Sequence, residues 1–137
     1  MTSPILALRA AILAMAQGDA ELASLMGGAL RFYDEPPRAA EPVYAVFGDV
    51  SARDWSTGSD RGHEQDAAVI VWAREGSARS ALLAAERIAA LIDDAALPLV
   101  GHRLVRMRVS GNDVTREGNT NLARVTVRLR AVTEVTT

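Results

Sequence analysis

Two segments near the C-terminus, residues 103–110 and 122–132, alternate strictly between apolar and polar side chains, and this period of two constrains the fold most. Successive side chains of a strand point to opposite faces, so each segment is predicted to be a strand with one apolar and one arginine-rich face. Residues 110–121 between them contain glycine, asparagine and aspartate, which favour a turn and therefore a hairpin. In that hairpin five arginines would share one sheet face: Arg106, Arg108, Arg124, Arg128 and Arg130.

This arginine group has one sign, whereas a solvated surface usually mixes both. The whole chain is also uneven: residues 1–94 contain fourteen Asp and Glu against eight Arg, and residues 95–137 contain three against seven. Three interpretations stay open. The arginines form a solvated face with local partners, a subunit interface that meets the acidic N-terminal part of a neighbouring copy, or a surface lining a passage for DNA. Arginine binds carboxylates and phosphates alike, so the residue type does not decide between them.

The N-terminal part of the chain has helical signals. Ser3 followed by Pro4 predicts the start of a helix over residues 4–16, because serine is a good N-cap and proline fits the first helical position. A short second helix is predicted over residues 20–26, with Asp19 as its N-cap.

The middle of the chain predicts strands over residues 43–55 and 66–74, joined by a polar loop over 56–64, and Gly48 marks a bulge or a close approach. A helix over 78–93, capped by Ser77, leads to the arginine hairpin. The predicted fold class is α+β: a mainly antiparallel four-stranded sheet of two hairpins, with the central helix and the N-terminal helices packed on one face. A length of 137 residues predicts a single domain, residues 1–137.

The sequence offers no catalytic or metal-binding pattern. It has no cysteine, and His63 and His102, its only histidines, do not have the spacing of a metal site. No serine or glycine falls in a nucleophile or phosphate-binding motif. We therefore expect a protein that is not an enzyme and uses no cofactor and no metal. The N-terminal apolar run is interrupted by Arg9 and follows no positive charge, so we expect neither a signal peptide nor a membrane span.

Two polar loops, 56–64 and 110–121, are long enough to reach a partner. Trp55 stands beside the first loop, and tryptophan is enriched at protein interfaces. The candidate partner-contact residues of the two loops are Trp55, Arg61, His63, Asn112, Arg116 and Asn119.

Several segments, none specific alone, occur in a recognisable order. They are residues 19–25 with Gly27-Gly28, the proline-led strand 42–50, Asp54-Trp55-Ser56-Thr57, the strand 69–75, Leu97-Pro98-Leu99 and the final strand ending at 129–134. Over nearly the whole chain this order resembles the tail-completion proteins of long-tailed phages, the lambda-like tail terminators. Abundant alanine, with arginine in place of lysine throughout, suits a prophage or a gene transfer agent of a GC-rich bacterium.

The resemblance implies structural work without catalytic residues. In that family about six copies form a ring on the head-proximal end of the tail tube, which ends tube polymerisation and docks to the head connector. The implied partners are copies of the chain itself, the tail tube protein and the head-connector or stopper protein, with DNA only passing through the lumen and no membrane. The implied location is the tail–neck junction of a virion assembled in the bacterial cytoplasm. The alternatives are another neck component, such as a stopper or adaptor, or a small α+β ligand-binding or enzymatic domain.

Overall fold

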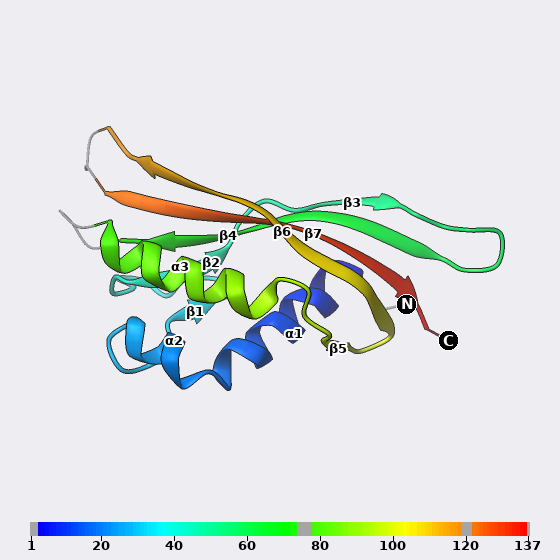
Figure 1. Cartoon of the computed structure of the whole chain (residues 1–137), viewed down its shortest axis with the longest axis horizontal. Helices are drawn as coiled ribbons and strands as arrows, with labels where there is room; N and C mark the ends of the chain where they lie inside the picture. Colours follow the sequence, from blue (N-terminus) through cyan, green and yellow to red (C-terminus); the bar gives the residue numbers. More distant parts are fainter. Residues whose placement is uncertain (1–2, 74–77, 119–121, 137) are drawn as a thin grey trace.

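The structure is a computed structural model of the chain, and it describes residues 3–73, 78–118 and 122–136. Within these residues the chain forms three helices and one seven-stranded sheet (Figure 1). The α+β class is confirmed, but the predicted four-stranded antiparallel sheet is wrong. The strands follow the order β1 (Phe32–Tyr33), β2 (Tyr44–Phe47), β4 (Gly62–Trp72), β7 (Ala123–Val135), β6 (His102–Arg116) and β5 (Pro98–Leu99), and β3 (Ser51–Asp54) pairs with β4.

Helix α1, Pro4–Gln17, begins where the sequence predicts. The Ser3 hydroxyl accepts a hydrogen bond from the Leu6 backbone N–H at 3.2 Å, which satisfies one of the free donors of the first turn. One residue per turn faces the core: Leu8, Ile12 and Ala16.

Arg9 is the one charged residue of this apolar helix, and its guanidinium group makes three contacts. Its guanidinium lies 3.3 Å from an Asp34 carboxylate oxygen and 5.2 Å from the centre of the Phe47 ring, and it donates to the Gly48 carbonyl at 3.4 Å. Arg9 therefore ties α1 to the segment that follows α2 and to the end of β2.

Helices α2, Ala20–Leu25, and α3, Arg79–Ile92, are joined by an ion pair. Asp19 caps α2 by accepting from the Leu22 N–H at 2.9 Å, and its two oxygens accept from Arg87 of α3 at 2.9 and 2.7 Å. The Arg87 hydrogen bonds lower the pKa of the Asp19 carboxyl below its usual value, and the bond from Leu22 adds to this effect.

Helix α3 buries five side chains against the sheet and the other helices: Ala81, Ala84, Ala85, Ile88 and Ile92. These three alanines and two isoleucines lie at helical spacing, and the helix predicted over 78–93 is confirmed. The predicted N-cap, Ser77, lies outside the described residues, and Ala78 precedes the helix without a side-chain cap. No helix in the described part of the chain is long and apolar enough to span a bilayer.

The predicted strand 43–55 is divided in two: β2, Tyr44–Phe47, and β3, Ser51–Asp54, both pair antiparallel with β4, Gly62–Trp72. Phe47 pairs with Val69 and Ser51 pairs with Asp66, so a step of four residues in this segment matches a step of three in β4. The extra residue forms a bulge between β2 and β3. A Cβ on Gly48 would lie 3.0 Å from the Ile70 side chain, which confirms a close approach at this position. β4 begins at Gly62, so residues 62–64 belong to a strand and not to the predicted loop. A short strand β1, Phe32–Tyr33, pairs in parallel with β2 and was not predicted.

The arginine hairpin is confirmed but is longer than predicted. β6, His102–Arg116, pairs with β7, Ala123–Val135, so the predicted turn residues at 111–113 are strand residues. Two register shifts, at Val105 and Ser110, change which residues of β6 face inward. Val105 is 40% exposed for this reason, although the alternation predicts it to be buried. A two-residue strand β5, Pro98–Leu99, pairs with the start of β6.

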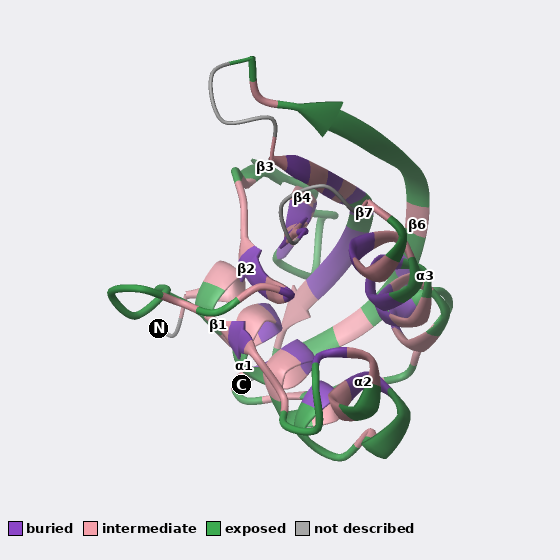
Figure 2. Cartoon of the chain, turned by 90° about the vertical axis from the view of Figure 1, so that its left-hand side faces the viewer, coloured by how far each residue is buried: buried purple, intermediate pink, exposed green. Residues whose placement is uncertain are grey.

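The three helices lie on one face of the curved sheet, as predicted (Figures 1 and 2). The core lies between them, and β7 contributes every second residue to it, from Ala123 to Ala131. The β3–β4 hairpin extends past the helices at one end of the molecule, and the β6–β7 hairpin projects away from the helical layer at the other end (Figures 1 and 2). The fold therefore has one covered face, one uncovered face and two projecting tips.

The Asp19–Arg87 ion pair predicts how the helical layer responds to substitution. Asp19→Ala removes the α2 cap and both bonds from Arg87, so we expect the free energy of unfolding to fall by about 1–2 kcal/mol. Urea denaturation followed by circular dichroism measures this change.

Asp19→Asn is the control, because asparagine also caps a helix but carries no charge, and it should cost less. The lowered pKa of Asp19 means that this carboxylate stabilises the fold fully above its unfolded pKa of about 3.9 and loses that effect as pH falls through the lower folded value. The stability difference between wild type and Asp19→Asn should therefore shrink below about pH 4, and a constant difference would contradict the assignment.

Candidate functional site: the charged face of the sheet

The uncovered face of the sheet gathers the five predicted arginines, as the hairpin pattern implied. Along β7, buried residues alternate with Arg124, Arg128 and Arg130. On the neighbouring strand β6, Arg106 stands opposite Val132 of β7, and Arg108 stands opposite Arg130 of β7. β3 and β4 continue the same face. We call this surface the charged face, and it comprises Arg53, Glu64, Asp66, Arg103, Arg106, Arg108, Asp113, Arg124, Arg128, Arg130 and Glu134.

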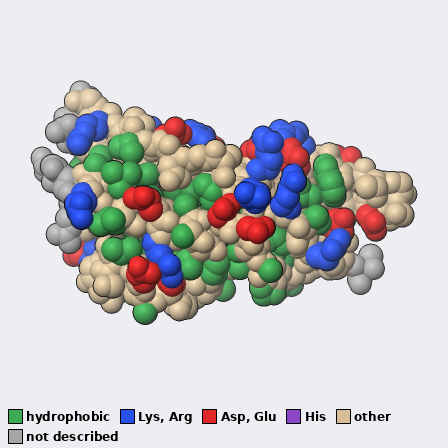
Figure 3. All heavy atoms as spheres, viewed as in Figure 1, with side chains coloured by type: hydrophobic (Ala, Val, Ile, Leu, Met, Phe, Trp, Pro, Cys, Tyr) green, Lys and Arg blue, Asp and Glu red, His purple; other side chains and the backbone are tan. Residues whose placement is uncertain are grey.

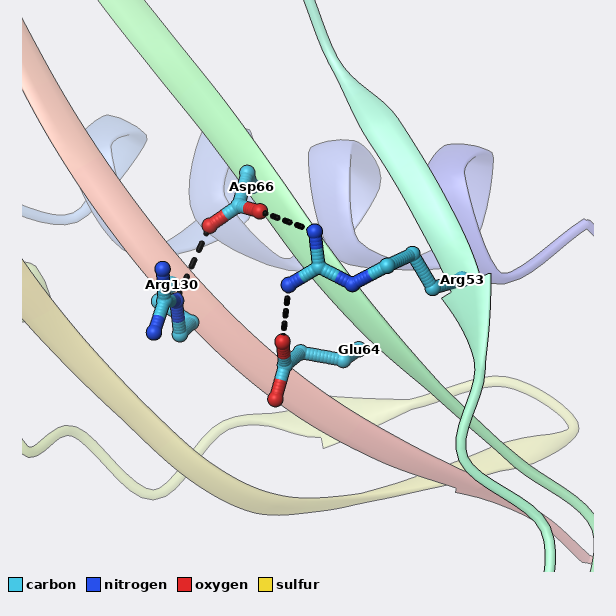
Figure 4. Close-up of polar contacts among 4 residues, drawn as sticks. All are labelled: Arg53, Glu64, Asp66 and Arg130. Carbon is cyan, nitrogen blue, oxygen red and sulfur yellow. Dashed lines mark hydrogen bonds and ion pairs between the residues drawn. The ribbon is translucent and has the colours of Figure 1, made fainter.

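A network of four residues links three strands at the middle of the charged face (Figure 4). Asp66 on β4 accepts from Arg130 Nε at 2.9 Å, and its other oxygen lies 3.1 Å from Arg53 Nη1. Arg53 on β3 also donates to Glu64. Hydrogen bonding to Glu64 raises the pKa of Arg53, so this guanidinium stays charged.

The remaining β7 arginines are also paired within the chain. Arg128 Nε donates to Asp113 of β6 at 2.8 Å. Arg124 lies 3.5 Å from Glu117 and 5.7 Å from the centre of the Trp72 ring, which is a cation–π distance.

On β6, Arg103 donates to Glu134 and Arg108 to Asp93, the latter at 3.3 Å. Asp93 also accepts from the Val109 backbone N–H at 2.9 Å, which attaches the end of α3 to the edge of the sheet. Arg106 is exposed and has no ion-pair partner among the described residues.

The charged face is therefore mixed in sign, and the expectation of a one-signed arginine surface is wrong. Figure 3 shows acidic side chains interspersed with the arginines on the side it presents. Val132 lies on this face between Glu64 and Arg106 and is only 3% exposed. Its strand neighbours Glu64 and Arg106 are long charged residues, and such side chains commonly lay their aliphatic parts over apolar surface.

An open hollow of about 630 Å³ lies on the charged face, and its lining includes Asp66, Arg124, Arg128 and Arg130. Those arginines are already bonded to carboxylates of the chain. The described residues contain no group of three His, Cys, Asp or Glu side chains arranged to hold a metal ion.

The structure separates the loop candidates into two groups at opposite ends. Trp55, 41% exposed, and Arg61 lie at the β3–β4 tip, where the Val135 N–H bonds to the Arg61 carbonyl at 2.8 Å. His63 is a half-buried residue of β4 beside Thr133 on the helix side of the sheet, so its assignment to a loop is wrong.

At the other tip, Asn112 and Arg116 are exposed but belong to β6, so they too are strand residues. Their place in the ladder, opposite Val127 and Ala123, overrides the local turn signal. Asn119 lies outside the described residues.

The sequence interpretation missed the acidic half of this surface. Glu64 and Asp66 share one parity of β4, which was a usable signal, but residue 64 had been placed in a loop. Asp113 was hidden in the same way, because Gly111, Asn112 and Asp113 together are typical of a turn.

Comparisons with known proteins agree with the resemblance. The family described as tail completion protein gp17 matches residues 10–134. A solved chain from the virion of a native gene transfer agent particle has a TM-score of 0.86 and 25% identity, covering 98% of this chain and 99% of that one. A second solved chain, 22% identical with a TM-score of 0.55, covers 99% of this chain and 98% of its own length, and supports the fold alone. Among curated proteins no sequence matches.

The Asp66 network predicts local rather than global effects. Asp66→Ala removes the ion-pair partner of Arg130 and one of the two carboxylate partners of Arg53, and β3 pairs with no described strand other than β4. We expect faster amide hydrogen exchange over residues 51–54 with little change in melting temperature, because exposed ion pairs contribute little to stability.

Hydrogen–deuterium exchange with mass spectrometry measures this effect. Asp49→Ala is the matched control, because Asp49 is an exposed carboxylate next to β3 with no ion pair among the described residues. Equal exchange of residues 51–54 in the two variants would show that the network does not hold β3.

Proposed function

The chain belongs to the tail completion protein gp17 family, and we propose that it is a structural protein of a phage-like particle. The observation that carries this proposal is the agreement of the whole fold, at a TM-score of 0.86, with a chain of a gene transfer agent virion. The match covers 98% of this chain and 99% of that one, so it rests on the whole fold and not on one shared motif. We place the protein in the virion, at the junction of tail and neck, with assembly in the bacterial cytoplasm.

The proposed role is that of a tail terminator. Copies of the chain form a ring, about six in number, on the head-proximal end of the tail tube, stop tube polymerisation and dock to the head connector. The match to the tail completion family and the agreement with a chain of a gene transfer agent virion support this role. A stopper or adaptor role is the nearby alternative.

Within that ring we assign the charged face to the DNA passage. In a subunit interface, most of the five predicted arginines would have to share or exchange their own carboxylate partners to meet the acidic part of a neighbour. Four of the five predicted arginines already have carboxylate partners within their own chain. A face of alternating sign neither repels DNA strongly nor holds it tightly, which suits a surface past which DNA must move.

Deletion of the gene tests the terminator role. We expect electron microscopy of particles from the source strain to show unjoined heads beside tails of uncontrolled length, because nothing would cap the tube. A deletion that is complemented from a plasmid is the control. Joined particles with normal tails in the uncomplemented strain would contradict the proposal.

Arg106→Glu tests the assignment of the charged face. Arg106 has no ion pair among the described residues, so the change should leave the fold and the particle count unchanged while DNA delivery falls several-fold. Particle counts by microscopy and delivery of a marker gene measure the two effects.

Arg79→Glu provides the matched charge change on the helical side of the molecule, where Arg79 is exposed at the start of α3. Loss of assembly in Arg106→Glu with a folded chain would instead make this face a subunit interface. Normal delivery would remove the role in DNA passage.

A further inference from the structure

The second half of β6, residues 110–116, is exposed on both faces and open along one edge. The same edge is covered near the start of the strand, where β5 pairs with His102 and Arg103 and the Asp94 N–H donates to the Met107 carbonyl at 2.8 Å. Beyond Val109 no described strand covers it. Seven residues of open edge, roughly 23 Å long, present unpaired backbone groups to a partner.

Strand β3 also has an open edge and two exposed faces. All four of its residues, 51–54, are exposed, and within the described residues it pairs only with β4. The two open segments lie at opposite edges of the sheet, and β4 and β7 lie between them. Neither segment contains proline or lysine, which commonly protect free edges.

Strand direction makes these two segments complementary. From β3 to β4, from β4 to β7 and from β7 to β6 the direction reverses each time, so β3 and β6 run antiparallel within one copy. Across the sheet, β3 lies level with Arg106, because Arg53 pairs with Glu64, Glu64 with Val132 and Val132 with Arg106. A second copy that is not turned over, and is displaced along the strands by the six residues of β7 from Val132 to Thr126, presents its β3 antiparallel to residues 110–116, with the charged faces continuous. This head-to-tail relation is the one that closed rings require.

We propose that residues 110–116 of β6 in one copy pair with β3 of the next copy, which extends the sheet from subunit to subunit. The inference rests on the proposed ring and names the contact that builds it. The partner is a second copy because both halves of the pairing, with matching direction and face, occur in one chain. β-Strand addition of this kind draws its affinity from main-chain hydrogen bonds and its specificity from alternate side chains.

One register matches both faces of the new pair. When Asp113 stands opposite Arg53 of the next copy, opposite charges meet on the charged face, and Asp113 already bonds Arg128 on that face. On the helix side the same register places Val114, which is 50% exposed, opposite an exposed alanine, Ala52.

Shifting the register by two residues in one direction places Val114 opposite Asp54, and shifting it in the other places Gly111 opposite Arg53. Both shifts lose the Asp113–Arg53 charge pair.

The exposed tryptophan is also accommodated. In this register Trp55 of the next copy stands opposite Gly111, and no described atom lies within 4 Å of the position that a Cβ on Gly111 would occupy. An aromatic side chain over an edge glycine is a recurrent way to stabilise a strand pair.

Engineered disulfides test the pairing directly, because the chain has no cysteine of its own. Residues directly opposite in an antiparallel pair have Cβ atoms about 5 Å apart, within reach of a disulfide. In particles carrying Val114→Cys with Ala52→Cys, mild oxidation should link most copies into a ladder of multimers on non-reducing gels. The same pair cannot close within one copy, because three strand spacings of about 4.8 Å separate β3 from β6.

Matched variants make the result specific. Arg116→Cys with Ala52→Cys shifts the register by two residues and should give little ladder, and each single cysteine should stay monomeric. Val114→Cys alone forming a dimer would mean that β6 pairs with β6, which overturns the proposal. A disulfide between the Val114→Cys variant and the tube protein, instead of another copy of the chain, would also overturn the proposal.

The outcome also separates this inference from the proposed function. Joined particles that contain the double variant but give no ladder would overturn the strand pairing and leave the terminator role intact. Particles that lack the protein altogether would overturn both.

Discussion

The strand β7 is the element on which the rest of the structure depends. It pairs with β4 along one edge and β6 along the other, so its ladder fixes the register of the three longest strands. Because its side chains alternate, the same strand supplies valine, leucine and alanine to the core and arginine to the charged face. A one-residue slip of β7 would exchange the two faces, burying arginines and exposing the core.

The sequence predicts well where a periodic pattern is long and local. The helix expected over 78–93 is Arg79–Ile92, the helix expected over 4–16 is Pro4–Gln17, and the strand expected over 122–132 lies within Ala123–Val135 but for its first residue. The sequence predicts poorly where pairing with a neighbouring strand overrides the tendency of single residues to form a turn. Gly111 and Asn112 are typical turn residues, but opposite Arg128 and Val127 they extend a strand. Two-residue strands such as β1 leave no periodic signal at all.

In the candidate site, too, one part could be predicted from the sequence and another could not. The arginines of the charged face could be predicted because each alternates with apolar neighbours in its own strand. Their partners could not, because Asp66 lies 64 residues from Arg130 and Asp93 lies 15 residues from Arg108. Only the folded register brings these carboxylates to the guanidinium groups, and with them the surface changes from a patch of arginines alone to a network in which most arginines have a carboxylate partner. The chemistry of a sheet face thus depends on its neighbours as much as on its own strand.

The open edge of β6 also has a consequence for the chain before it is built into a particle. A head-to-tail contact that closes into a ring on a template can, without one, continue as an open chain of copies. A free edge strand is in addition a known starting point for aggregation. If copies pair as proposed, assembly covers this edge, whereas a copy outside the assembly keeps it open.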